Sequence, residues 1–428
     1  MVGFKQTLCA LLLMAFAGVT VAQNNTNSPY TRYGYGDLVN QNFGNSKAMG
    51  GIAFGLRDGS QINPLNPASY TAIDSLTFLF EGGASLQNSN ISDGSVKLNV
   101  KNSSFDYIAM QFRLHPRLGI AFGFTPYSTV GYKFGKTSSI EGSDVTITNV
   151  FYGEGGLQQI FGGLGFKILD NLSIGANAGY LYGDINYQTA ASFSNRGDQT
   201  ITYNNLSVKS YNVSFGLQYT QPFNKDNSLT IGLVYGLGHN MNSTEVKGIQ
   251  VTADNTSSST SDSYNVVNER EEYNGYGIPH TFGAGLTFTH KQKLTIGADY
   301  TLQQWSKAKY NNTEGLYYQD RSKVAVGAEY TPNLLSRNYL GRIRYRVGAY
   351  YSTPYLNNLP TGEGPSEYGV SAGFGFPLYL FQKHTMLSIT GQYVRVSPSI
   401  SRMLSEDRFV IKLGLTFNER WFMKWRVQ

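Results

Sequence analysis

The chain has 428 residues, of which 14% are aromatic and only 14% charged, and its formal net charge is +6. Few charges combined with 48 Gly and 31 Tyr are atypical of a soluble domain and typical of a transmembrane barrel, where apolar residues occupy alternate positions. No apolar run of about eighteen residues follows residue 22, which excludes a helical membrane protein, and the modest charge does not indicate nucleic-acid binding.

Residues 1–22 read as a secretory signal peptide. Lys5 supplies a positive start, residues 11–17 form a short apolar stretch, and small residues lead to a cleavage site after Ala22. Cys9, the only cysteine, lies before the apolar stretch, so the processed chain is expected to have neither a disulfide nor thiolate chemistry.

Residues 23–74 are predicted to form an N-terminal plug, or hatch, inside a barrel. Their Gly and Pro spacing forbids a regular helix or strand, yet apolar residues such as Ile52, Phe54 and Leu56 need a packing partner. Irregular backbone persists at membrane depth only where protein or a water-filled cavity surrounds it. The lumen of the following barrel is therefore the expected location.

From Ser75 to residue 428 the pattern is that of an antiparallel transmembrane β-barrel of about 14 strands, an all-β fold. Phe78 and Phe80 face one way, while Thr77 and Glu81 face the other, as expected for lipid outside and lumen inside. A sandwich is excluded because many segments exceed ten residues. The predicted strands are 75–89, 103–114, 118–134, 154–168, 171–187, 204–222, 228–246, 278–289, 293–309, 320–331, 339–353, 367–380, 385–398 and 407–419.

The connections are predicted to alternate between short turns and long loops. Short ones fall at 115–117, 170–171, 224–227, 290–292, 332–333 and 381–383, and long ones include 91–102, 135–152 and 247–277. This is the outer-membrane pattern of a Gram-negative bacterium, and an even strand count places both termini in the periplasm. The polar loop at 248–277 is expected to be flexible and solvated; a lid or docking surface is the alternative.

Two features of the predicted strands point to function. Pro126 lies inside the third strand, where a proline removes a ladder donor; this predicts either a kink with a gap in the wall or an earlier end of the strand. Arg342, Arg344 and Arg346 share one face of strand eleven and should point into the lumen. There they would bind the anionic head of an amphiphile or, the favoured interpretation, pair with plug carboxylates such as Asp58.

Ahead of the first strand stand residues 48–51 (Ala-Met-Gly-Gly), Asp58, and Asn66, Pro67 and Ala68, and residues 413–422 form the closing strand and tail. Through the first set the chain resembles the FadL/TodX family of outer-membrane transporters for hydrophobic compounds, and through its tail it resembles a Bacteroidota-type branch. The first resemblance implies a hatch whose Asn-Pro-Ala turn is a signature, a fourteen-stranded barrel, and a side opening at the kink near Pro126.

An enzyme is not expected. His239, with Ser243 nearby, is the one catalytic pair considered, no cluster has metal-ligand spacing, and no cofactor is implied. The leading hypothesis is passive uptake of hydrophobic or amphipathic small molecules. The alternative is a non-transporting accessory subunit of a Bacteroidota outer-membrane protein secretion or assembly machine, docking partners through its outer loops. Expected partners are outer-membrane lipid, a hydrophobic ligand and other outer-membrane proteins, but no nucleic acid.

Overall fold

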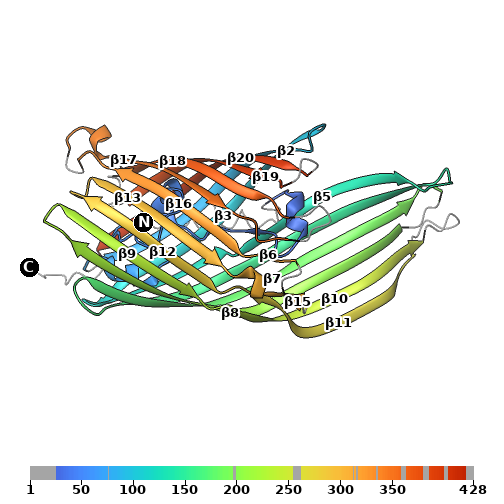
Figure 1. Cartoon of the computed structure of the whole chain (residues 1–428), viewed down its shortest axis with the longest axis horizontal. Helices are drawn as coiled ribbons and strands as arrows, with labels where there is room; N and C mark the ends of the chain where they lie inside the picture. Colours follow the sequence, from blue (N-terminus) through green and yellow to red (C-terminus); the bar gives the residue numbers. More distant parts are fainter. Residues whose placement is uncertain are drawn as a thin grey trace, which may run out of the picture.

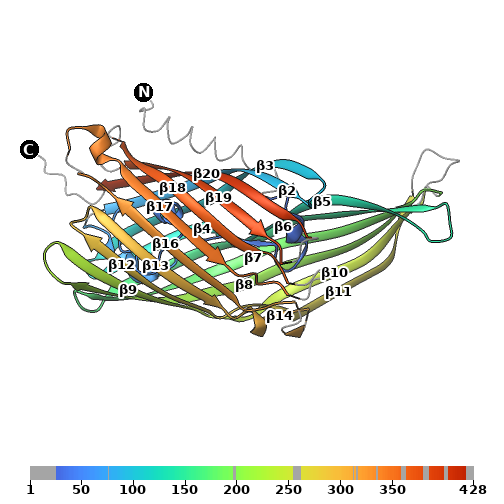
Figure 2. The same cartoon turned by 45° about the horizontal axis from the view of Figure 1, so that its top comes forward.

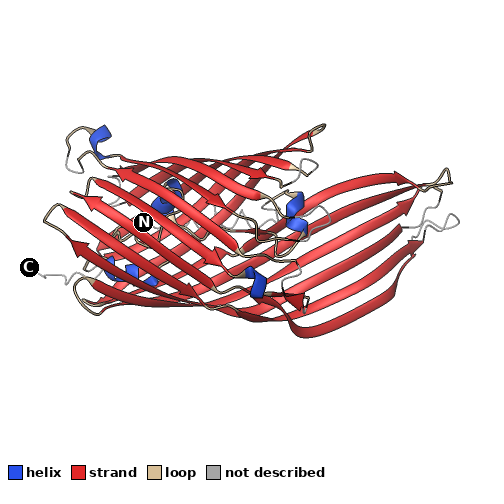
Figure 3. Cartoon of the chain, in the orientation of Figure 1, coloured by secondary structure: helices blue, strands red, loops and turns tan. Residues whose placement is uncertain are grey.

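The computed structural model describes residues 26–75, 77–195, 199–253, 262–311, 313–314, 317–333, 336–357, 363–378, 385–399 and 403–420. The predicted signal peptide (1–22) and the turn at 381–383 lie outside these residues. The chain forms a closed antiparallel β-barrel of fourteen strands, which confirms the predicted fold class (Figures 1 and 3). The first and last strands close the ring, with Thr77 opposite Arg420 and Ser92 opposite Ser405.

Three strands of the ring are each broken into two segments. In ring order the elements are β2 (Thr77–Ser92), β3 (Lys97–His115), β4 (Leu118–Pro126) with β5 (Ser128–Ser139), β6 (Thr146–Lys167), β7 (Leu172–Phe193), β8 (Gln199–Pro222), β9 (Asn227–Gly236) with β10 (His239–Ala253), β11 (Asp262–Ile278) with β12 (Thr281–His290), β13 (Leu294–Gln303), β16 (Arg321–Tyr330), β17 (Arg344–Ser352), β18 (Ser366–Leu378), β19 (Thr385–Ser397) and β20 (Ser405–Arg420). A short hairpin, β14 (Lys309–Tyr310) with β15 (Thr313–Glu314), follows the 3-10 helix η3 (Trp305–Lys307).

The alternating pattern sorts side chains between the two faces of the wall. Outward residues such as Phe122, Leu164 and Val347 are about half exposed, whereas Glu81 and Asp299 face inward and are buried. An apolar exterior around a polar interior suits hydrocarbon outside and a hydrated or protein-filled lumen inside. Among the described residues, no helix is long and apolar enough to cross a membrane.

Six strands continue far beyond the rest of the ring and form a protruding sheet (β5–β8, β10 and β11), which extends to the right in Figures 1 and 2. The prediction of long loops over 91–102, 135–152 and 247–277 was wrong, because the described residues there are largely strands: 91–102 extends β2 and β3, and the other two ranges lie mostly in the protruding sheet. Residues 199–208 of β8 pair with β10, and β10 pairs in turn with β11. Polar residues can extend a ladder once neighbouring backbones lie alongside, because the backbone supplies the hydrogen bonds.

Residues 26–74, called the inner segment below, pack within the ring of strands. The segment contains η1 (Pro29–Arg32), the two-residue strand β1 (Asp37–Leu38), α2 (Gly44–Ala48) and η2 (Pro67–Ala72). Helix α2 contacts β2 and β17–β20, and η2 contacts β4 and β6–β8, so the segment touches opposite sides of the wall. Its buried Phe43 and Tyr70 join an apolar cluster with Leu79 and Phe161 of the wall.

Candidate functional site

The Asn-Pro-Ala turn fixes the inner segment both to itself and to the wall. The Asn66 side chain caps η2 by accepting a hydrogen bond from the backbone N–H of Ala68 at 3.2 Å. Its Nδ2 donates to the carbonyl oxygens of Phe54 at 2.8 Å and of Leu217, in β8, at 3.2 Å. Pro67 begins the helix, where its missing N–H costs nothing. All of the polar atoms of the asparagine amide are thus used.

Two wall glycines permit this close approach. A Cβ placed on Gly216 would lie 2.1 Å from Asn66 Oδ1, and one on Gly175 would lie 2.4 Å from the carbonyl carbon of Pro67. Both distances are far below van der Waals contact, so any larger residue would push the turn away from the wall. The backbone of the inner segment therefore sits directly on the backbone of the barrel.

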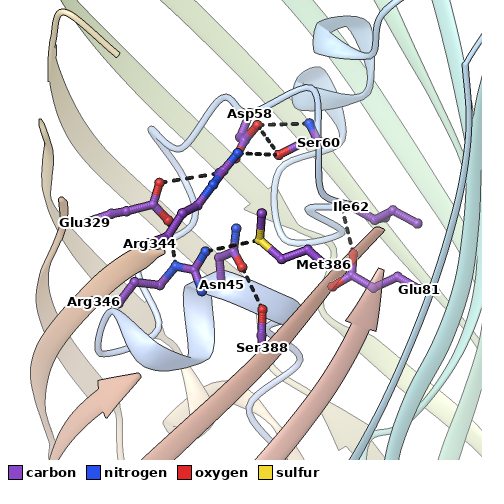
Figure 4. A network of polar contacts seen from close by, with 10 residues as sticks. All are labelled: Asn45, Asp58, Ser60, Ile62, Glu81, Glu329, Arg344, Arg346, Met386 and Ser388. Atoms are coloured by element: carbon purple, nitrogen blue, oxygen red, sulfur yellow. Dashed lines mark hydrogen bonds and ion pairs between the residues drawn. The ribbon is translucent and has the colours of Figure 1, made fainter. Parts of the chain in front are cut away.

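A polar network joins the inner segment to strands β16 and β17 (Figure 4). Arg344 Nη1 lies 3.1 Å from Asp58 Oδ2 and 3.5 Å from Glu329 Oε1. Arg346 Nε donates to Glu329 Oε2 at 2.6 Å, and Ser60 donates to Asp58 Oδ1 from both its backbone N–H and its hydroxyl, at 2.9 and 2.7 Å. Two of the three predicted arginines therefore lie in one ion-paired network with the inner segment.

The third arginine, Arg342, lies outside the strand that carries the other two. The side chain of Asn338 accepts a hydrogen bond from Leu340 N and begins a 3-10 helix, η4 (Tyr339–Arg342), so the strand starts only at Arg344. Arg342 lies at the end of that helix, where its Nη2 donates to the carbonyl oxygen of Arg337 at 3.0 Å. The prediction that all three arginines share one strand face was wrong because a local cap ends the strand pattern.

Burial of Asp58 opposes its ionisation, but Arg344 and the two Ser60 hydrogen bonds outweigh it and lower the pKa of the carboxyl group below its usual value. Asp58 is therefore charged at neutral pH. The attraction to Arg344 holds the middle of the inner segment against the wall.

Charged side chains also line a cavity of about 210 Å³ beside the first part of the inner segment. Lys47 forms an ion pair with Asp106 of β3. Arg408 of β20 lies 3.1 Å from Asp37 and 2.6 Å from Glu406. A second cavity of about 190 Å³ is lined largely by amide, hydroxyl and apolar groups. Both cavities are smaller than the roughly 300–1,000 Å³ of common ligand pockets, and the several charged side chains that line the first do not suit a hydrocarbon.

An aromatic box holds Tyr35 of the inner segment. The Tyr35 ring is fully buried, and its centroid lies 6.0 Å from the ring centroid of Trp305 and 6.1 Å from that of Tyr318. Its hydroxyl donates a hydrogen bond to the carbonyl oxygen of Gly277 at 3.0 Å. Gly34 and Gly36, on either side, adopt φ of 62° and 81°, a left-handed conformation that favours glycine. The box is completed by Tyr276, Tyr310 and Tyr355.

The wall is interrupted next to this box, where β4 ends at Pro126 and β5 begins at Ser128. Strand β4 pairs with both β3 and β6, whereas β5 pairs with β6 on one side and, among the strands that the structure describes, with β1 of the inner segment alone on the other. The hydroxyl group of Thr31 accepts a hydrogen bond from the N–H of Gly131 and donates one to the carbonyl oxygen of Gly131, each at 3.2 Å, as the backbone of a neighbouring strand would. The inner segment thus covers part of the break.

The catalytic pair considered from the sequence is not formed as expected. His239 Nε2 lies 2.9 Å from Ser210 Oγ rather than bonding to Ser243, and its ring stacks on Tyr211 at a centroid distance of 3.8 Å. In the described part of the chain, no group of three or more His, Cys, Asp or Glu residues is placed to hold a metal ion.

Sequence reasoning missed Tyr35, Thr31 and Arg408 as anchors of the inner segment. The alternation Tyr33-Gly34-Tyr35-Gly36 was the available signal for the aromatic box, because glycines on both sides of an aromatic residue allow a sharply bent backbone to insert a ring. No local signal marks Thr31 or Arg408 as anchors, since Gly131 and Asp37, which they respectively contact across the interface, lie far away in the sequence.

Comparisons with known proteins agree with this architecture. The Pseudomonas putida toluene transporter TodX superposes with a TM-score of 0.61 at 12% identity over 90% of this chain and 100% of that one. The Ralstonia pickettii toluene transporter TbuX gives 0.58 at 13% identity over 88% and 98%, and the CymD monoaromatic hydrocarbon channel gives 0.56 at 15% identity over 88% and 97%. At such low sequence identity the structural likeness shows a shared fold alone, and it confirms the predicted FadL/TodX-like fold.

No curated protein matches the chain. The model of the BamG family matches residues 4–428, almost the entire sequence. The chain therefore belongs to the BamG family.

Proposed function

We propose that this barrel is a non-transporting accessory subunit of an outer-membrane protein assembly machine in a Gram-negative bacterium of the Bacteroidota type. In this proposal residues 23–74 act as a fixed plug and both termini face the periplasm. The barrel is embedded in outer-membrane lipid, and the protruding sheet contacts partner proteins outside the membrane. The name of the BamG family hints at this role.

The observation that carries the proposal is how the interior is filled. The inner segment is held by Asp58 and Arg344, by Tyr35 in its aromatic box and by the turn at Asn66. Cavities of about 210 and 190 Å³ beside it are smaller than common ligand pockets, and Lys47, Asp106 and Arg408 make the lining of the first unsuited to a hydrocarbon. Ion pairs and hydrogen bonds at several separate points favour a plug that stays in place, because moving it would leave charges unpaired.

Passive uptake of hydrophobic or amphipathic small molecules is the second candidate. The interruption after Pro126 favours it, because a strand break beside the inner segment gives a lateral route through the wall if residues 31–39 move. Solved structures with this fold include a hydrocarbon channel and toluene transporters. In this second proposal Arg344 and Arg346 would release Asp58 and Glu329 to meet an anionic head group.

Native mass spectrometry of the full chain, purified gently from its own outer membrane, separates the two. A species heavier by whole protein subunits, without a small adduct, is expected for the accessory role. A single barrel carrying an adduct of a few hundred daltons would instead support transport and overturn the proposal.

A shortened hairpin tests the docking role of the protruding sheet. Residues 250–266 are replaced by an Asn-Gly turn, so that the last retained pair is Ile249 opposite Val267. Loss of partner proteins, with unchanged heat-modifiable gel mobility of the barrel, is expected. Partners that remain bound to the shortened protein would contradict docking through this sheet.

A further inference from the structure

We propose that the free edge of β5, at the break in the wall, receives an extended acidic segment of a partner protein. This inference deepens the accessory role proposed above and rests on it. The partner segment would add to the sheet as a further strand and would be selected by its carboxylates.

The chain already uses this edge for strand addition. Asp37 and Leu38 pair in antiparallel fashion with Thr129 and Ser128, and Thr31 supplies a side-chain oxygen to the N–H and carbonyl groups of Gly131. The edge is therefore accessible to an added strand, and the inner segment occupies only its first four residues, 128–131.

Beyond Gly131 the edge continues without a partner in the described part of the chain. Residues 130–139 pair with β6 on the opposite side only. The N–H and C=O groups of one residue point to the same side of a strand, and those of the next residue point to the other side. Since the groups of Gly131 point to the free edge, those of Lys133, Gly135 and Thr137 do so as well. Such a row of unpaired donors and acceptors is a template for an added strand.

Charge around the break favours an acidic occupant. The two strands on either side of it, β3 and β5, carry four exposed lysines, none of which forms an ion pair within the described residues: Lys97, Lys101, Lys133 and Lys136. No acidic residue occurs in 97–104 or in 128–139. Lysines on an edge strand disfavour pairing with most other strands, because a neutral or basic strand brings no negative charge to compensate the ammonium groups. An acidic strand neutralises them, so the same residues both reject other strands and select this one.

The length of the edge sets the size of the partner segment. Residues 133–139 span seven positions, which at about 3.3 Å per residue accommodate a strand of roughly 23 Å. Lys133 and Lys136 lie three positions apart and therefore on opposite faces of β5, so alternating carboxylates on one face of the added strand would meet one of the two, while its backbone satisfies the edge. We therefore take an acetylated eight-residue peptide of alternating Glu and Thr as the probe, with an alternating Lys and Thr peptide as its counterpart.

Binding of the labelled peptides to the detergent-purified full chain is measured by fluorescence anisotropy. The Glu-Thr peptide is expected to bind more tightly than the Lys-Thr peptide, and the difference should shrink at high salt. The double variant Lys133→Glu with Lys136→Glu should bind the Glu-Thr peptide about tenfold more weakly, while Lys225→Glu with Lys293→Glu, at turns on the opposite rim, should bind it unchanged. Equal binding of both peptides, or equal binding by both double variants, overturns the proposal.

A backbone variant separates strand addition from simple charge attraction. Thr137→Pro removes one edge-directed N–H without removing a ladder bond to β6, whereas Thr137→Ala keeps that N–H. Peptide binding weakened about tenfold by the proline but not by the alanine supports strand addition. Equal binding by the two variants contradicts it.

The same variants distinguish failure of this site from failure of the accessory role. If whole-protein subunits accompany the wild type and also both β5 variants in native mass spectra, the docking site is wrong while the accessory role stands. If no subunit accompanies the wild type but the Glu-Thr peptide binds as expected, the accessory role is wrong and the acidic-strand site stands.

Discussion

Replacing Tyr35 by alanine is expected to release the first part of the inner segment while the barrel stays closed. The ring is fully buried in the aromatic box, and removal of a buried large aromatic side chain costs about 3–5 kcal/mol. Loss of the hydroxyl bond to Gly277 accounts for about 1 kcal/mol of this. Because residues 30–39 join the wall only through the short pairing of Asp37 and Leu38 with β5 and through Thr31, while the fourteen strands pair with one another, the cost should appear as local opening.

Hydrogen exchange followed by mass spectrometry measures this opening. At tenfold per 1.4 kcal/mol, amides of residues 30–39 should exchange faster by roughly two to three and a half orders of magnitude. Tyr35→Phe, which loses only the hydroxyl, should show about a fivefold increase. Tyr330→Ala, at an outward-facing and half-exposed position, is the matched control and should leave these amides unchanged.

Two results would refute the reasoning. Unchanged exchange of residues 30–39 in Tyr35→Ala would mean that the box does not hold the segment. Faster exchange throughout the barrel strands would mean that Tyr35 stabilises the whole fold rather than a local anchor.

Three further perturbations test the other anchors of the inner segment. Because folding lowers the pKa of Asp58, its ion pair with Arg344 stabilises the inner segment fully above the unfolded pKa of about 3.9, and this stabilisation is lost as the pH falls through the folded pKa. Pepsin cleavage within 56–62 should therefore rise as the pH is lowered. Asp58→Asn removes the charge that holds Arg344 and should abolish this pH-dependent rise in cleavage. Thr31→Ala should increase exchange of the Gly131 amide by about tenfold, because a bonded donor loses its partner, while Thr31→Ser retains protection; equal behaviour of the two would argue against the side-chain bond. Gly216→Ala would place a Cβ 2.1 Å from the amide oxygen of the Asn-Pro-Ala turn and should lower the thermal midpoint, measured by the loss of heat-modifiable gel mobility; an unchanged midpoint would show that the turn can retreat.

The local pattern of residues was sufficient to predict the fold class and the number of strands. Phe78 and Phe80 against Thr77 and Glu81 define two faces, because successive side chains of a strand always point in opposite directions. The same pattern failed over 248–277 because polar residues such as Gln250, Thr252 and Ser263 show no apolar alternation, although their backbones form a ladder. It also failed at Arg342, where the cap at Asn338 outweighs the continuing alternation of charge.

The contacts that define the interior required the tertiary structure. Arg344 and Asp58 are separated by 286 residues, and Thr31 and Gly131 by 100, so no spacing in the sequence identifies either pair. The aromatic rings around Tyr35 come from several parts of the chain. The edge of β5 is free because β3 pairs with β4 and not with β5. The direction of a side chain follows from its neighbours along the strand, whereas its partner depends on how the closed ring brings distant strands around the inner segment.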